Sequence, residues 1–149
     1  MDTPNEGKNK AVILFFCFGV LSIVYHEVML AAASDVLAGS SVTAAMGILA
    51  AGVPPVVVKL MVPWVLQKMP HIYKMVTIFI LFACGLIILV VSPDAVTRLA
   101  GIGVAEAGIS LAEITFLSLT AFYSPLTTSA FAAGLAAGSA IGSLYYTGE

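Results

Sequence analysis

Charged side chains are scarce in this sequence. They make up 9% of its 149 residues, whereas an average soluble domain carries about 25%. Hydrophobic residues make up 60%, and the mean hydropathy is +1.08. A chain with so little charge cannot cover a water-facing surface, so lipid must act as its solvent. We therefore predict an all-α integral membrane protein whose main partner is the lipid bilayer.

Basic clusters, paired cysteines and catalytic motifs are missing as well. Phosphate binding needs clustered Lys and Arg, so a net charge of −2 without a basic run argues against a nucleic-acid partner. Cys17 and Cys84 lie in apolar stretches without metal-ligand spacing, which predicts two buried thiols that act as small hydrophobes. No Walker A, HExxH, GxSxG or paired CxxC pattern occurs, so no enzyme, cofactor or metal site is predicted.

Most of the remaining sequence consists of long apolar runs. A helix needs about 20 apolar residues to cross a bilayer core, and these runs are too long and too uniform for membrane strands. Residues 1–10 are polar and are expected to form a tail, followed by a bundle over residues 11–149. The sequence predicts a polytopic transmembrane bundle of about five spans, at residues 11–38, 42–66, 75–91, 95–122 and 127–146.

At the N-terminal end, a cleaved signal peptide is the alternative to a first membrane span. Residues 31–33 resemble a signal-peptide cleavage site, but the long apolar run before them contains His26 and Glu27, which argues against cleavage. The chain stops at residues 147–149 without a polar tail. That ending suggests a truncated chain or an isoform.

Turn residues and prolines separate or interrupt the spans. A tight turn is expected at residues 39–41 and a polar loop at residues 67–74. Pro54 and Pro55 remove two backbone donors and are predicted to kink the second span. The kink serves either helix packing alone or a transport site, since broken helices often line such sites.

The basic residues predict the orientation of the spans. Lys8 and Lys10 precede the first span, and Lys68 and Lys74 lie between the second and the third. Arg98 lies on the opposite side, near the start of the fourth span. Because cytosolic loops carry an excess of Lys and Arg, we predict a multi-pass protein with a cytosolic N-terminus.

Two glutamates inside the fourth span are the strongest candidates for function. A charge at the bilayer centre costs about 2.5–3.5 kcal/mol on insertion scales. Glu106 and Glu113 are seven positions apart, so they share a helix face with Ser110 and nearly with Thr120. Carboxylates that face a bundle interior bind protons, cations or polar solutes. The alternative is a structural ion pair with Lys59.

Charged residues of the first two spans are further candidates for proton or solute transport. Glu27 lies near the middle of the first span beside His26, and Asp35 lies near its far end. Lys59 follows the two prolines of the second span. The structural alternatives are a packing role for His26, an interfacial position for Asp35, and a Lys59 ammonium that snorkels to the headgroups.

Small residues recur along two spans at helical spacing. In the fifth span they are Ala130, Gly134, Gly138 and Gly142, and in the fourth span they are Gly101, Ala105, Gly108 and Ala112. Such stripes let a neighbouring helix approach closely. We interpret them as packing faces, with a substrate path along them as the alternative.

One stretch of the fourth span resembles a known family. Residues 113–123, with the core TFLSLTAFY, resemble a motif of the battenin family, the lysosomal membrane proteins linked to neuronal ceroid lipofuscinosis. The family motif has a glutamate at the position of Glu113. Residues 28–37 resemble its first-helix motif, and residues 58–60 followed by Pro63 resemble its second-helix motif. The matches extend over nearly the whole chain.

The chain also departs from the family pattern. Ser34 stands where the family has His, Ser22 and Ile23 stand in place of an Asn pair, and Ser124 and Pro125 replace Pro-Arg. Most members are much longer, so this chain resembles their N-terminal half.

The resemblance implies a fold similar to the N-terminal half of the major facilitator superfamily, placed in the lysosomal or vacuolar membrane. It implies a role in lysosomal homeostasis through luminal pH, basic amino acids and glycerophosphodiester clearance. Half a transporter supplies one wall of a midplane site. The expected partners are therefore a second half or a homo-oligomer, together with protons or a small polar solute. The alternatives are a non-transporting scaffold or regulator that packs against partner helices, and an oligomeric proton or cation channel.

Overall fold

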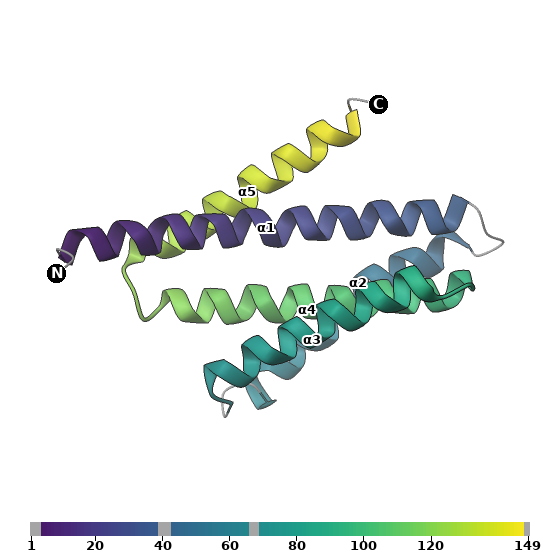
Figure 1. Ribbon diagram of the computed structural model, residues 1–149, viewed down its shortest axis with the longest axis horizontal. Coiled ribbons are helices and arrows are strands. Elements are labelled where there is room, and N and C mark those ends of the chain that lie inside the picture. The colour runs from purple at the N-terminus through teal and green to yellow at the C-terminus, as the bar shows by residue number, and fades with distance from the viewer. Residues whose placement is uncertain (1–3, 39–42, 66–68, 148–149) are drawn as a thin grey trace. The chain divides into compact units, whose positions relative to one another are not determined.

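The computed structural model describes residues 4–38, 43–65 and 69–147, and every regular element in these ranges is a helix (Figure 1). The helices are α1 (Pro4–Ala38), α2 (Ala44–Val65), α3 (His71–Val91), α4 (Ala95–Thr120) and α5 (Pro125–Thr147). The prediction of an all-helical bundle is confirmed. The turn expected at residues 39–41, and Gln67 and Lys68 of the expected loop, lie outside the described residues.

Three described helical segments are long and apolar enough to cross a membrane: Gly7–Ala38, His71–Val91 and Ala95–Thr120. The apolar part of α2, Ala45–Met61, is shorter. Helix α5 is rich in Gly, Ala, Ser and Thr, and these small residues lower its hydropathy. Membrane crossing by α2 and α5 stays a prediction.

Two helices begin earlier than the hydropathy pattern predicts. Helix α1 begins at Pro4, inside the predicted tail, because proline is well suited to the first helical position. Helix α3 begins at His71, inside the predicted loop, directly after the extended residue Pro70 (φ −64°, ψ 150°). Hydropathy marks where a chain enters lipid, whereas helical hydrogen bonds continue into the polar region.

The described helices contribute to two compact units. One unit comprises Met1–Glu27 and Thr115–Glu149, and the other comprises Val28–Ile114. The first contains the N-terminal part of α1, the end of α4, and α5. The second contains the remainder of α1 and α4, with α2 and α3 between them in sequence.

In the first unit, α5 packs directly on the N-terminal part of α1 through glycines. A Cβ added to Gly134 would overlap the carbonyl oxygen of Phe16, and one added to Gly19 would overlap the carbonyl oxygen of Phe131. A Cβ on Gly138 would overlap Ile23 Cγ2. Backbone therefore meets backbone at this crossing, as small-residue stripes allow.

Aromatic rings join the end of α4 to the same α1 surface. The Phe116 ring stacks on Phe18, with centroids 4.5 Å apart and planes 13° apart, and it also contacts Phe131 at 6.4 Å. Tyr123 meets Phe15 edge-on at 5.6 Å. Phe116 and Tyr123, two aromatic residues of the TFLSLTAFY stretch, thus pack against α1 within the first unit.

In the second unit, α3 packs closely against the first two-thirds of α4. A Cβ on Gly85 would lie 2.7 Å from the Ala105 nitrogen, and one on Gly101 would lie 2.9 Å from the Leu89 nitrogen. Gly108 lies under the Phe82 ring, which a Cβ would approach to 2.8 Å. The glycines of the predicted α4 stripe therefore face α3 within the chain.

The prediction that both cysteines are buried is wrong. Cys17 and Cys84 are exposed on the surface of the chain, as are many large apolar side chains, among them Phe79 and Val90. In a bilayer protein an apolar residue is equally well solvated by lipid and by a neighbouring helix. Apolar character alone does not predict burial in such a protein.

Candidate ion-pair site on helices α2 and α4

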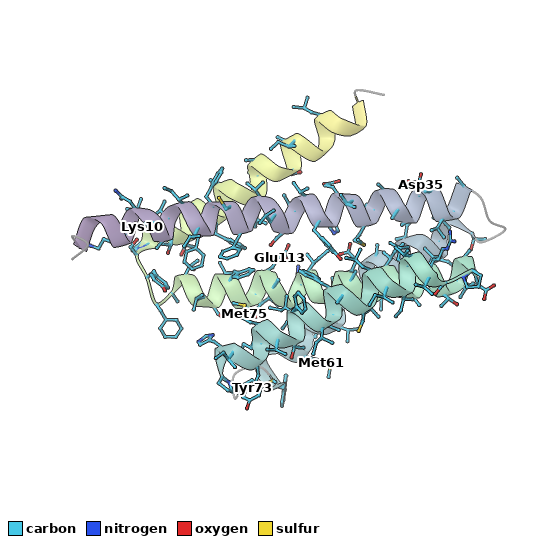
Figure 2. All side chains as sticks on the ribbon, in the orientation of Figure 1. Lys10, Asp35, Met61, Tyr73, Met75 and Glu113 are labelled. Atoms are coloured by element: carbon cyan, nitrogen blue, oxygen red, sulfur yellow. The ribbon has the colours of Figure 1, made fainter. Side chains whose placement is uncertain are left out.

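The structure brings two of the candidate charges together inside the second unit. Lys59 Nζ of α2 lies 3.5 Å from Glu113 Oε2 of α4. The Lys59 side chain is 54% exposed and the Glu113 side chain is 26% exposed. Figure 2 labels Glu113 on the α4 ribbon. The ion pair that the sequence left open as an alternative is present.

The local sequence explains how α2 presents its lysine. Lys59 sits in the apolar run Pro-Pro-Val-Val-Val-Lys-Leu-Met, where its methylene stem suits the same surroundings as its neighbours. Helix α2 stays helical through Pro54 and Pro55. These prolines carry no N–H, so the carbonyls of Ala50 and Ala51 lack the donor that a residue four positions later normally supplies.

Two polar residues precede Glu113 on α4 and are enclosed by protein. Glu106 is 1% exposed and Ser110 is 3% exposed. The glutamates of the predicted stripe thus occupy different surroundings, one enclosed and one half-buried beside a cation.

The far end of the predicted polar stripe has a local role instead. Thr120 Oγ1 donates a hydrogen bond to the Leu117 carbonyl at 2.7 Å and lies 3.0 Å from Thr128 Oγ1, which donates to it. Thr127 Oγ1 donates to the Ser124 carbonyl at 2.7 Å. These hydroxyls stabilise the α4–α5 connection inside the first unit.

The remaining candidates lie elsewhere. Glu27 belongs to the first unit, where a Cβ on Gly142 would lie 2.7 Å from Glu27 Cγ, so its side chain covers that glycine. Asp35 is exposed near the C-terminal end of α1, where Figure 2 labels it. In the described part of the chain, no three His, Cys, Asp or Glu side chains gather to hold a metal ion.

Sequence reasoning missed two residues of the second unit. Gly103 lies off the predicted α4 stripe, and a Cβ there would be 3.2 Å from both the Ala50 carbonyl oxygen and Pro54 Cγ. The orientation prediction uses Arg98 only as a marker of topology, yet its Nε donates a hydrogen bond to the Ser92 carbonyl at 2.8 Å, at the C-terminal end of α3. No pattern in the sequence points to Gly103, because its contact with Pro54 depends on how α2 and α4 cross.

Comparison with known families places this chain among helical membrane proteins of the battenin type. The profile of the CLN3 protein family matches residues 13–148, which is nearly the whole chain. The chain therefore belongs to the CLN3 protein (battenin) family, as its TFLSLTAFY stretch predicted.

Fungal proteins are among its relatives. Protein btn1 of Aspergillus fumigatus is 30% identical over 143 residues, which cover 92% of this chain and 31% of the relative. Protein BTN1 of Candida albicans is 33% identical over 111 residues, covering 73% and 26%. Protein BTN1 of Kluyveromyces lactis is 31% identical over 137 residues, covering 92% and 35%. This chain thus spans about a third of their length, and no solved structure matches it.

Proposed function

We propose that this chain is a transporter-like protein of the lysosomal or vacuolar membrane in which the Lys59–Glu113 pair responds to protons. The observation that carries the proposal is an ion pair between two helices of an apolar bundle, 3.5 Å long and open on the Lys59 side. Membership of the battenin family supports the membrane setting.

The pair joins an ammonium to a carboxylate, and a carboxylate can accept a proton. A nearby ammonium favours the ionised form of a carboxyl group, whereas removal from water favours the protonated form. Glu113 is half-buried and lies beside Lys59. Protonation of Glu113 would remove the attraction between α2 and α4. A proton gradient could thereby bias these helices between a joined and a separated arrangement.

The substrate class follows from the family alone. We propose a role in lysosomal homeostasis through luminal pH, basic amino acids and glycerophosphodiester clearance, with the N-terminus in the cytosol. The chain spans about a third of its relatives, and a midplane site needs two walls. Transport therefore requires a homo-oligomer or a second half in this proposal.

The scaffold alternative has less support. It relied on glycine faces that bind partner helices. Gly134 and Gly138 of α5 lie against α1 within the first unit, and Gly101 and Gly108 lie against α3 within the second. These glycines already have neighbours in the same chain, so a partner helix would need another face.

Solute flux in proteoliposomes tests the proposal. The purified chain is reconstituted with an acidic interior, and uptake or release of radiolabelled arginine and of a glycerophosphodiester is measured with and without the pH gradient. Protein-free liposomes and a Glu113→Gln preparation are the controls. Flux that requires both the gradient and Glu113 supports the proposal. Flux equal to that of protein-free liposomes, for the chain alone, for its assembled oligomer and for the chain reconstituted together with a second half, would overturn it.

A further inference from the structure

Gly103 of α4 lies against the proline break of α2. A Cβ at this glycine would be 3.2 Å from the Ala50 carbonyl oxygen and 3.2 Å from Pro54 Cγ. The distance to Pro54 Cγ is shorter than the optimal separation of about 3.5–4.0 Å between non-bonded carbon atoms, so an added Cβ would make a tight contact there. Gly103 is itself buried. The glycine therefore lets α4 approach α2 at the turn that lacks backbone hydrogen bonds because of Pro54 and Pro55.

The break needs support from outside α2. Pro54 and Pro55 cannot donate to the carbonyls of Ala50 and Ala51, so two backbone hydrogen bonds of this turn are missing. A helix that lacks such bonds is a usual place for bending. The direction of α2 beyond Pro55 is then set less by its own hydrogen bonds than by the surface on which the break rests. Gly103 supplies part of that surface.

Lys59 lies directly beyond this break. It follows Pro55 by four residues, about one helical turn, so the two share a helix face. Helices α2 and α4 thus meet at two places, which follow the same order along both helices: first Pro54 with Gly103, and then Lys59 with Glu113. Lys59 follows Pro54 by only five residues, so a displacement of α2 at the first contact is expected to move the second as well.

We propose that Gly103 is a positioning residue: its contact with the Ala50 carbonyl and the Pro54 ring sets the separation of Lys59 and Glu113. The inference rests on the proposed function of that pair. The 3.5 Å separation of the pair already exceeds the length of about 2.7–2.9 Å of a charge-assisted hydrogen bond, so an outward displacement of α2 moves the two groups further from hydrogen-bonding distance. A methyl group at residue 103 pushes α2 outward and lengthens the pair.

Crosslinking measures this separation without relying on transport. Lys59→Cys and Glu113→Cys are combined in a full-length background with Cys17→Ser and Cys84→Ser, and a short bifunctional thiol reagent joins them. Gly103→Ala is then added. The matched control is Gly52→Ala, which changes a glycine two residues before Pro54 where an added Cβ has no neighbour within 4 Å.

The expected result is a several-fold lower crosslinking yield with Gly103→Ala and an unchanged yield with Gly52→Ala. Equal yields for the two variants would overturn the proposal. If Gly103→Ala does not give monodisperse protein, Pro54→Ala is used to test the positioning role in its place. This variant removes the ring that contacts Gly103 and restores an N–H donor for the Ala50 carbonyl. The yield should again change, and an unchanged yield would sink the inference.

A transport assay tests the positioning role of Gly103 separately from the proposed function of the Lys59–Glu113 pair. With Lys59 and Glu113 intact, Gly103→Ala should shift the pH profile of flux, while Gly52→Ala should leave the profile in place. Altered crosslinking without any flux in the parent protein would reject the proposed function and retain the positioning role. Normal flux with unaltered crosslinking would reject the positioning role alone.

Discussion

Lys59 Nζ lies 3.5 Å from Glu113 Oε2 and so links α2 to α4 in the second unit. Each charge alone would cost about 2.5–3.5 kcal/mol at the centre of a bilayer. Pairing lowers that cost, and the exposed fraction of Lys59 leaves its ammonium accessible from one side. The same contact can therefore serve helix packing or a proton-dependent step, and variants of either residue separate these roles.

Replacement of Glu113 by glutamine distinguishes the two roles. Glu113→Gln keeps the side-chain shape and removes both the charge and the proton. In a functional role the variant folds and localises normally but loses pH-dependent transport. Its free energy of unfolding should fall by less than the cost of an unpaired charge at the bilayer centre, about 2.5–3.5 kcal/mol, because the flexible stem of the exposed Lys59 lets its ammonium reach the headgroups. Flux across a pH series and thermal unfolding in detergent give both quantities.

A structural role predicts a different pattern for the same pair. Glu113→Gln then loses considerably more stability, and Lys59→Met in the same chain restores part of it by removing the unpaired charge. A correctly folded Glu113→Gln protein with full activity at every pH would exclude this residue from the mechanism.

Two glycines of α5 should differ in whether their substitution can be rescued. Gly138→Ala overlaps the Cγ2 atom of Ile23, so Ile23→Ala should relieve most of the overlap and leave a contact of 3.0 Å with the Val20 carbonyl oxygen. Gly134→Ala overlaps the backbone carbonyl of Phe16, which no side-chain truncation removes. Overpacking of this kind costs about 1–3 kcal/mol. Thermal stability in detergent provides the measurement, and Gly7→Ala, with no atom within 4 Å of an added Cβ, is the control. If side-chain truncation at Ile23 and at Phe16 restored the stability of Gly138→Ala and Gly134→Ala equally, α5 would have to pack differently on α1.

The stacked rings of Phe116 and Phe18 should contribute measurably to the stability of the first unit. Phe116→Leu keeps an apolar side chain but loses the ring stacking, which is worth about 0.5–1.5 kcal/mol beyond area burial. Phe79→Leu is the comparison, since Phe79 is 74% exposed on α3. A lower unfolding temperature is expected for Phe116→Leu alone. Identical shifts for the two variants would contradict the stacking argument.

Accessibility labelling tests the predicted orientation of α3. Tyr73→Cys and Asp94→Cys, each in a Cys17→Ser and Cys84→Ser background, place thiols beyond the two ends of the apolar segment of this helix. A membrane-impermeant thiol reagent should label Tyr73→Cys from the cytosolic side and Asp94→Cys from the luminal side. Labelling of both from one side would rule out a membrane-spanning α3 and the five-span topology with it.

Composition alone determined the solvent and the type of secondary structure. So few charges and such long apolar runs admit only helices in lipid, and helix periodicity places Gly134 and Gly138 on one face. The end of α3 at Val91 also follows from the Ser-Pro-Asp that comes after it. The starts of α1 and α3 did not follow from hydropathy, which reports lipid contact rather than hydrogen bonding.

Tertiary structure decided which apolar and polar faces meet. Lipid and a neighbouring helix solvate an apolar side chain equally well, so the sequence could not reveal that Cys17 and Cys84 face outward. It allowed Lys59 and Glu113 as partners but did not select them, because pairing depends on the angle and distance at which α2 and α4 cross. The contact of Gly103 with the Pro54 ring arises from that same crossing. The periodicity of residues along one helix does not tell which residues of another helix will contact them.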